Sequence, residues 1–115
     1  MTFPVFFENS SVPAILSKIS PVKISAITLG PLVFCDGSVT DTLRAHEKIH
    51  WEQYKECLIL GFLILYAYYW IKGMMFCKTG EESYYSIPFE KEAYENQDNA
   101  EYLISRKAFA WRDYR

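Results

Sequence analysis

Residues 41–56 decide the fold and read DTLRAHEKIHWEQYKE. They hold both histidines of the chain, His46 and His50, in an HExxH pattern. On a helix, residues four positions apart lie on the same face. The spacing therefore predicts two imidazole rings stacked on one side of a helix.

That helix is predicted to begin near Asp41 and to be long. Ser38 or Thr40 can cap its N-terminus, and the helix dipole favours Asp41 in the first turn. No proline occurs between Asp41 and Phe76. The segment predicts one helix to about Phe76, or two helices separated at Gly61.

The paired histidines match the ligand geometry of zinc. Two imidazoles at this spacing can bind one tetrahedral Zn²⁺ at about 2.0–2.1 Å. Glu47, beside this face, is placed to take a proton from the water that such an ion binds, which is the general-base role in a metallopeptidase. The alternative is two ordinary histidines on a half-exposed helix, beside the solvated charges of Glu47 and Lys48.

A third ligand must come from elsewhere, because zinc takes three protein ligands when water holds the fourth position. No third histidine exists, and no extended metzincin pattern follows His50. The natural source is a carboxylate on a second helix packed antiparallel to the first. Residues 88–96 predict such a helix, with Pro88 in its first turn. The candidate carboxylates are Glu90, Glu92, Glu95 and Asp98.

The HExxH stretch and the segment IPFEKEAY at 87–94 together resemble the gluzincin type of zinc metallopeptidase, in which a glutamate on a downstream helix completes the site. More closely, residues 25–114 look like a family of small bacterial and phage proteins that carry a metallopeptidase motif. HExxH with FExEAY is the specific part of this resemblance. The resemblance implies a minimal zincin-like fold, zinc endopeptidase activity and Zn²⁺ as cofactor.

The resemblance also assigns individual residues. It makes Glu90 the third ligand, because the alanine of the gluzincin pattern E-x-x-A-[DN] aligns with Ala93. Tyr94 stands where many gluzincins have an Asp that hydrogen-bonds a ligand histidine. We therefore expect Gln53, one turn beyond His50, or Tyr94 itself to contact a ligand histidine on its side away from the metal and to support its orientation.

Peptide hydrolysis also needs a donor for the developing oxyanion and a surface that holds the substrate. By the same resemblance, residues 24–29 are the edge strand that aligns a peptide by β-addition. The candidate oxyanion donors are Tyr84, Tyr85, Tyr102 and Arg106.

The remaining segments complete an α+β domain. The N-terminal third predicts two or three short strands that form a small sheet, including 23–29 and 31–34. Residues 78–82 have the composition of a surface loop. Capping-box spacing at 98–101 predicts a final helix over about 102–110.

Residues 57–71 form a run of 15 positions without a charge. A membrane span needs about 20 residues, so this run is short for one. Its aromatic residues nevertheless resemble an interfacial belt. We expect a helix buried on most sides, and membrane contact through residues 57–71 is the alternative.

Length, charge and cysteine spacing limit the number of domains, the classes of binding partner and the cellular location that we expect. A chain of 115 residues that is 50% hydrophobic predicts a single domain over 1–115. Its net charge of −2 disfavours nucleic acid as a partner. The cysteines, Cys35, Cys57 and Cys77, lack CxxC spacing, and the first residues lack a signal-peptide pattern. We expect reduced, mostly buried thiols and a cytoplasmic location.

The sequence thus predicts a zinc-dependent metallopeptidase that acts on a peptide or protein. One alternative is a zinc-binding interaction module without turnover, and the other is a small membrane-associated protein. The presence of Glu47 favours the enzyme, because a structural zinc site needs no base. A closed site with four protein ligands would favour the module.

Overall fold

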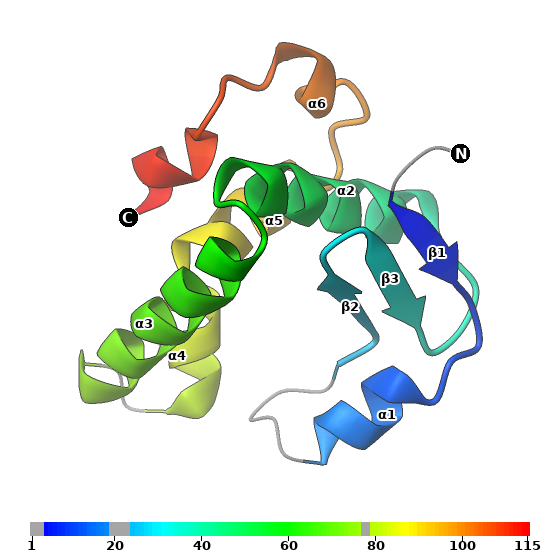
Figure 1. The fold of residues 1–115 in the computed structure, drawn as a ribbon, viewed down its shortest axis with the longest axis horizontal. Helices are drawn as coiled ribbons and strands as arrows, with labels where there is room; N and C mark the ends of the chain where they lie inside the picture. The colour runs from blue at the N-terminus through cyan, green and yellow to red at the C-terminus, as the bar shows by residue number, and fades with distance from the viewer. Residues whose placement is uncertain (1–3, 19–23, 77–78) are drawn as a thin grey trace.

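A computed structural model describes residues 4–18, 24–76 and 79–115 and shows an α+β fold, as the sequence predicts (Figure 1). Its strands are β1 (Val5–Phe7), β2 (Ala26–Leu29) and β3 (Leu32–Cys35). Its helices are α1 (Val12–Ser17), α2 (Asp41–Glu56), α3 (Leu60–Phe76), α4 (Gly80–Ser86), α5 (Pro88–Asn96), α6 (Tyr102–Ser105) and the 3₁₀ helix η1 (Ala110–Tyr114). The α1 helix was not predicted, whereas α5 has the predicted bounds.

The sheet has the order β1-β3-β2, so β2 is an edge strand. β3 pairs parallel with β1 and antiparallel with β2. The hairpin between β2 and β3 turns at Gly30, whose φ of 62° favours glycine. Tyr54 on α2 donates from its hydroxyl to the carbonyl oxygen of Thr28 at 2.6 Å, which fixes β2 against the HExxH helix. Of the predicted strand 23–29, residue 23 lies outside the described residues.

The helix α2 begins as predicted, because Thr40 caps it by accepting from the backbone N–H of Leu43 at 3.1 Å. The segment forms two helices, one of the two predicted alternatives, but the break comes before Gly61: α2 ends at Glu56, and the chain turns at Leu58 and Ile59. Both residues have left-handed φ values, 58° and 62°. They turn the chain by 109° between α2 and α3.

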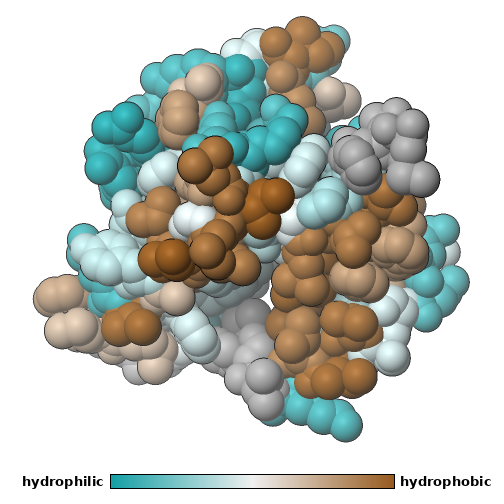
Figure 2. All heavy atoms as spheres, in the orientation of Figure 1, coloured by the Kyte–Doolittle hydropathy of each residue, from teal (hydrophilic) through white to brown (hydrophobic). Residues whose placement is uncertain are grey.

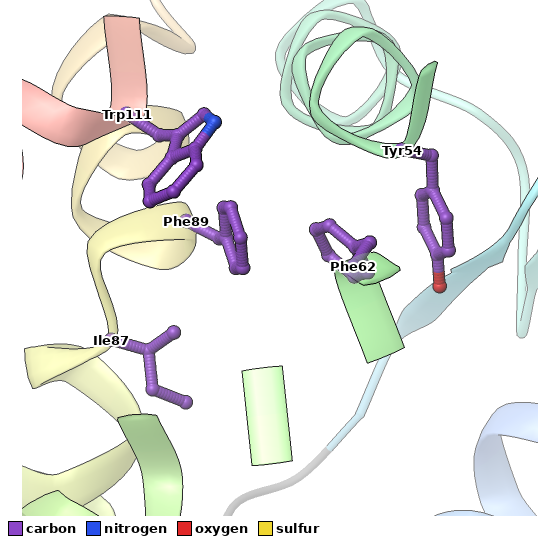
Figure 3. Packing of buried hydrophobic residues seen from close by; sticks show 5 residues of the cluster. All are labelled: Tyr54, Phe62, Ile87, Phe89 and Trp111. Carbon is purple, nitrogen blue, oxygen red and sulfur yellow. The ribbon is translucent and has the colours of Figure 1, made fainter. Parts of the chain in front are cut away.

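This turn creates the core. It brings Phe62, at the start of α3, back onto Tyr54, with their ring centroids 3.9 Å apart. The ring centroid of Phe62 lies 4.5 Å from that of Phe89 of α5, and the ring centroid of Phe89 lies 4.8 Å from that of Trp111 of η1. With Ile87, these residues form the buried cluster in Figure 3. The core therefore joins α2, α3, α5 and the C-terminal segment.

The expectation that residues 57–71 are buried on most sides is wrong. In α3 only Phe62 and Gly73 are buried. Leu65, Tyr66, Tyr69 and Trp70 are half-buried against the core. The large apolar side chains on the other face are exposed, from Leu60 through Ile64 and Ile71 to Phe76. No helix among the described residues is long and apolar enough to span a membrane alone; α2 and α3 meet that test only as a pair with the 109° bend.

Two further predictions are corrected. Of the predicted loop 78–82, residue 78 lies outside the described residues. Residues 80–82 belong to α4, because Thr79 caps the helix by accepting from the backbone N–H of Glu82 at 3.0 Å. The predicted helix over 102–110 is interrupted at Arg106, whose ψ of 126° is extended. The helix α6 has no side-chain cap, so the predicted capping box does not form.

The described cysteines, Cys35 and Cys57, are both free thiols. Cys35 is fully buried, and burial raises the pKa of its thiol to about 11. An inert, protonated thiol agrees with the expectation from the sequence. Cys77 lies outside the described residues.

Candidate metal centre

Two helices bring the predicted ligands together. His46 and His50 lie one turn apart on α2, and Glu90 lies in the first turn of α5. One ligand atom of each residue lies within 4.8 Å of the others, and all three side chains are buried. Across 4–18, 24–76 and 79–115 this is the only group of three or more such side chains that can hold a metal ion.

The distances between the ligand atoms suit zinc. Nε2 of His46 lies 3.1 Å from Nε2 of His50. Oε1 of Glu90 lies 3.0 Å from Nε2 of His50 and 3.3 Å from Nε2 of His46. Atoms bound to one tetrahedral zinc at about 2.0–2.1 Å lie roughly 3.3 Å apart. The site therefore fits a zinc ion with little rearrangement of its side chains.

The remaining nitrogen of each imidazole is held by a glutamine. Nδ1 of His46 lies 2.8 Å from Oε1 of Gln97, and Nδ1 of His50 lies 2.7 Å from Oε1 of Gln53. An amide oxygen only accepts, so each Nδ1 carries a hydrogen, and a cation that displaces any proton on Nε2 meets a lone pair on each imidazole. Two lone pairs and a carboxylate oxygen then converge on one point, which is the donor set of a cation site.

The charges of His50 and Glu90 also favour a cation between their side chains. Burial lowers the pKa of His50, but the charge of Glu90 and its hydrogen bond outweigh burial and raise that pKa to about 9. Burial raises the pKa of Glu90, but the two histidines outweigh burial and hold that pKa well below its usual range. Glu90 is therefore a carboxylate. Its negative charge stabilises a cation at Nε2 of either histidine.

Glu47 lies beside the ligands and is held by the sheet. It is 4% exposed, and one of its carboxylate oxygens accepts a hydrogen bond from Thr28 Oγ1 on β2. Glu47 is not part of the ligand group. This placement matches a carboxylate that handles protons next to a metal rather than one that binds it.

The ligands and Glu47 line a cleft of about 570 Å³. One wall is β2 with the residues just before it, and the other is α3, through Phe62, Leu63, Tyr66 and Trp70. Figure 2 shows apolar side chains over the start of α3 and, across a hollow, over the sheet and α1. The cleft is therefore an apolar channel with its charged groups at the metal centre.

The other predicted carboxylate ligands lie elsewhere. Glu92 is fully buried and binds Arg106, Tyr102 and Gln53. Glu95 is exposed, and the exposed Asp98 accepts from Thr42 Oγ1 at 3.3 Å. None of these three carboxylates joins the group.

The candidate oxyanion donors separate in the same way. Tyr84 lines the cleft, and its hydroxyl lies 3.1 Å from that of Tyr94. Burial raises the pKa of the Tyr84 hydroxyl, so this group stays protonated. Tyr85 lies outside this cleft, and Tyr102 and Arg106 bind Glu92 behind the ligands.

Both residues predicted to support the ligands, Gln53 and Tyr94, contact them, and two further contacts to the ligands were not predicted. Gln53 binds His50 as described, and the ring of Tyr94 lies edge-on to His46 with centroids 4.5 Å apart. The hydroxyl of Tyr66 donates to Glu90 Oε2 at 2.8 Å, a contact that the sequence pattern of residues 57–71 does not indicate.

Gln97 is the second contact that was missed. It follows α5 directly and carries no motif, so no sequence signal marked it.

Comparison of the chain with protein-family models, with curated proteins and with solved structures found no match.

Proposed function

We propose that this protein is a zinc metallopeptidase of the gluzincin type. The observation that carries the proposal is the convergence of His46, His50 and Glu90 on one point, in the cleft that Glu47 also lines. The described residues supply three protein ligands, which leaves a coordination position for water or substrate. An open position favours the enzyme over an interaction module with a closed zinc site.

His46, His50 and Glu90 would hold the zinc ion, which would polarise a peptide carbonyl and lower the pKa of the attacking water. Glu47 accepts the proton that this water loses as its oxygen bonds to the carbonyl carbon. Glu47 then returns the proton to the amide nitrogen as the carbon–nitrogen bond breaks. The hydrogen bond from Thr28 Oγ1 restricts the orientation of this carboxylate. Tyr84, protonated and in the same cleft, donates to the carbonyl oxygen as its negative charge develops.

The cleft supports an extended peptide as the substrate. β2 is an edge strand, and its residues line one wall of the cleft. A peptide that pairs with this edge adds a strand to the sheet and passes the metal centre. The opposite wall contributes Phe62, Leu63 and Trp70, which suits a substrate with large apolar side chains.

The experiment that tests this function is cleavage of a diverse peptide pool by the wild type and by Glu47→Gln, each with its zinc content measured. The variant should keep zinc and lose about 10² to 10⁴ in rate, because it lacks the base. Equal cleavage by both proteins would refute Glu47 as the base. A zinc-loaded wild type that cleaves nothing would favour the interaction module.

A second candidate function, peripheral membrane binding, is favoured by the exposed apolar side chains of α3. Ile64 is 62% exposed and Ile71 is 61% exposed. Both lie on α3, in which Lys72 is the only charged residue. A soluble monomer rarely exposes a continuous apolar face of this length. Flotation with phosphatidylcholine vesicles tests it. Ile71→Glu should abolish co-flotation, and Ile104→Glu, at a position that is 87% exposed on α6, should not.

A further inference from the structure

Buried polar side chains behind the ligands form a continuous hydrogen-bonded chain. Gln53 Oε1 accepts from His50 Nδ1 at 2.7 Å, and Gln53 Nε2 donates to Glu92 Oε1 at 3.0 Å. Gln53 and Glu92 are both fully buried. Glu92 accepts in turn from Arg106, from Nε at 2.5 Å and from Nη2 at 3.1 Å. The ligand His50 is thus connected to Arg106 through two side chains that water does not reach.

Gln53 has its orientation fixed by this chain. Its Nε2 also donates to the carbonyl oxygen of Phe89 at 3.0 Å, so both amide hydrogens have acceptors. The amide oxygen is then the only atom that can face His50. If Glu92 were absent or turned away, the Gln53 side chain would lose one of the contacts that set this direction. Glu92 therefore acts on His50 through Gln53.

Arg106 also holds the end of α2. Its Nη1 and Nη2 donate to the two carboxylate oxygens of Glu56 at 2.8 and 3.0 Å. Glu56, the last residue of α2, accepts as well from the backbone N–H of Phe109 at 2.6 Å. One guanidinium, 4% exposed, thereby joins α2 to α5, the two helices that carry all three ligands. A lysine has no planar fork with which to bind both carboxylates in this way.

The C-terminal segment is shaped for this contact. The helix α6 stops before Arg106, where the backbone becomes extended, and Phe109 adopts a left-handed φ of 60°. Buried ion pairs add little net stability compared with apolar side chains of similar size, but their geometry is directional. We propose that Arg106 is a positioning residue for the metal centre, acting on His50 through Glu92 and Gln53.

The test is a double-mutant cycle on zinc affinity, and it rests on the proposed zinc site. Zinc dissociation constants are measured by chelator competition for the wild type, Gln53→Ala, Arg106→Lys and the double variant, all shown to be folded. Each single variant should bind zinc about tenfold more weakly. The double variant should bind no more than about twofold more weakly than the weaker single variant, because both changes break one chain. The absorption spectrum of the Co²⁺ protein should shift in the same way in all three.

A matched control separates positioning from general destabilisation. Gly73→Ala disturbs the contact between α3 and α4, because an added Cβ would lie 2.5 Å from Ser83 Oγ. It should lower stability and leave zinc affinity within about twofold of the wild type. If Arg106→Lys does not fold, Tyr102→Phe replaces it in the cycle, since that change removes a donor to Glu92 without altering charge.

The outcomes distinguish this inference from the proposed function. An Arg106 variant with unchanged zinc affinity, or losses that multiply to about a hundredfold in the double variant, overturns the positioning role alone. A wild type that binds no zinc overturns both the positioning role and the metallopeptidase.

Discussion

Thr28 Oγ1, on the edge strand β2, donates a hydrogen bond to the carboxylate of Glu47 on the HExxH helix α2. The strand that would bind the substrate backbone therefore also holds the side chain that would handle the proton. Thr28 is 5% exposed and its carbonyl oxygen accepts from Tyr54, so the strand is fixed at this position. The sheet and the HExxH helix thus form one unit.

Removal of this hydrogen bond should lower activity without affecting the metal. Thr28→Val keeps the shape of the side chain and removes the donor, so we expect about a tenfold lower kcat/KM as Glu47 loses its orientation. Thr28→Ser keeps the hydroxyl and should retain activity. Zinc content should equal that of the wild type in both. Equal rates for the valine and serine variants would show that the hydrogen bond does not orient the base.

The third ligand can be tested by comparing two glutamates of α5. Glu90→Gln should weaken zinc binding at least about tenfold, because the carboxylate is lost from a three-ligand site. Glu95→Gln, on the same helix but exposed, should leave zinc binding unchanged. Chelator competition measures both. A larger loss of zinc affinity in Glu95→Gln than in Glu90→Gln would show that Glu90 is not a ligand.

Glu92→Ala is not a neutral control, although its position outside the ligand group suggests one. The fully buried carboxylate binds Arg106, and its removal leaves a buried guanidinium with only Glu56 as partner. Because Arg106 keeps Glu56, the cost is that of the buried donors that lose their acceptor, about 1–3 kcal/mol. Chemical denaturation should show this loss, and a change below about 1 kcal/mol would contradict the burial of the network.

The turn between α2 and α3 predicts a stabilising substitution. Leu58 has a φ of 58° and is 85% exposed, so its side chain has a strained backbone and few contacts. A left-handed conformation costs a residue with Cβ about 1–2 kcal/mol. Leu58→Gly relieves this strain and should raise the free energy of unfolding by up to about 1 kcal/mol, after the entropy of glycine is subtracted. A lower melting temperature would contradict the strain.

Gly73 and Gly61 provide a second comparison by thermal unfolding. Gly73→Ala should destabilise the protein by about 1–3 kcal/mol, because the new Cβ would lie 3.2 Å from Ser83 Cα as well as too close to its hydroxyl. Gly61→Ala meets Cys57 Cβ at 3.6 Å, an ordinary contact inside a helix. It should be neutral or stabilising by up to about 1 kcal/mol. Similar losses at both positions would contradict the close packing of α3 on α4.

Local patterns predicted the centre of this fold well. The i, i+4 histidines, the Thr40 cap and Pro88 at the start of α5 are signals that a few neighbouring residues determine. They located α2, α5 and the two histidines, whereas the resemblance to gluzincins selected Glu90 from the candidate carboxylates. The strand pattern likewise found β2 and β3.

Features that depend on tertiary contacts were not predictable in this way. The turn at Leu58 carries no glycine, and it forms because Phe62 gains the stack on Tyr54. Arg106 interrupts the last helix in order to reach two carboxylates that lie far away in the sequence. Exposure of α3 follows from which face its neighbours cover, and an all-apolar helix offers no periodicity that could show it.

Metal content and coordination of the purified protein test the proposed zinc site. We expect about one zinc per chain. X-ray absorption at the zinc edge should fit two imidazole nitrogens, one carboxylate oxygen and one light ligand from solvent at about 2.0–2.2 Å. Ala substitution of His46 should remove the zinc. A protein that takes up no zinc, or a bound zinc with a thiolate or a fourth protein ligand, would contradict the open site formed by His46, His50 and Glu90.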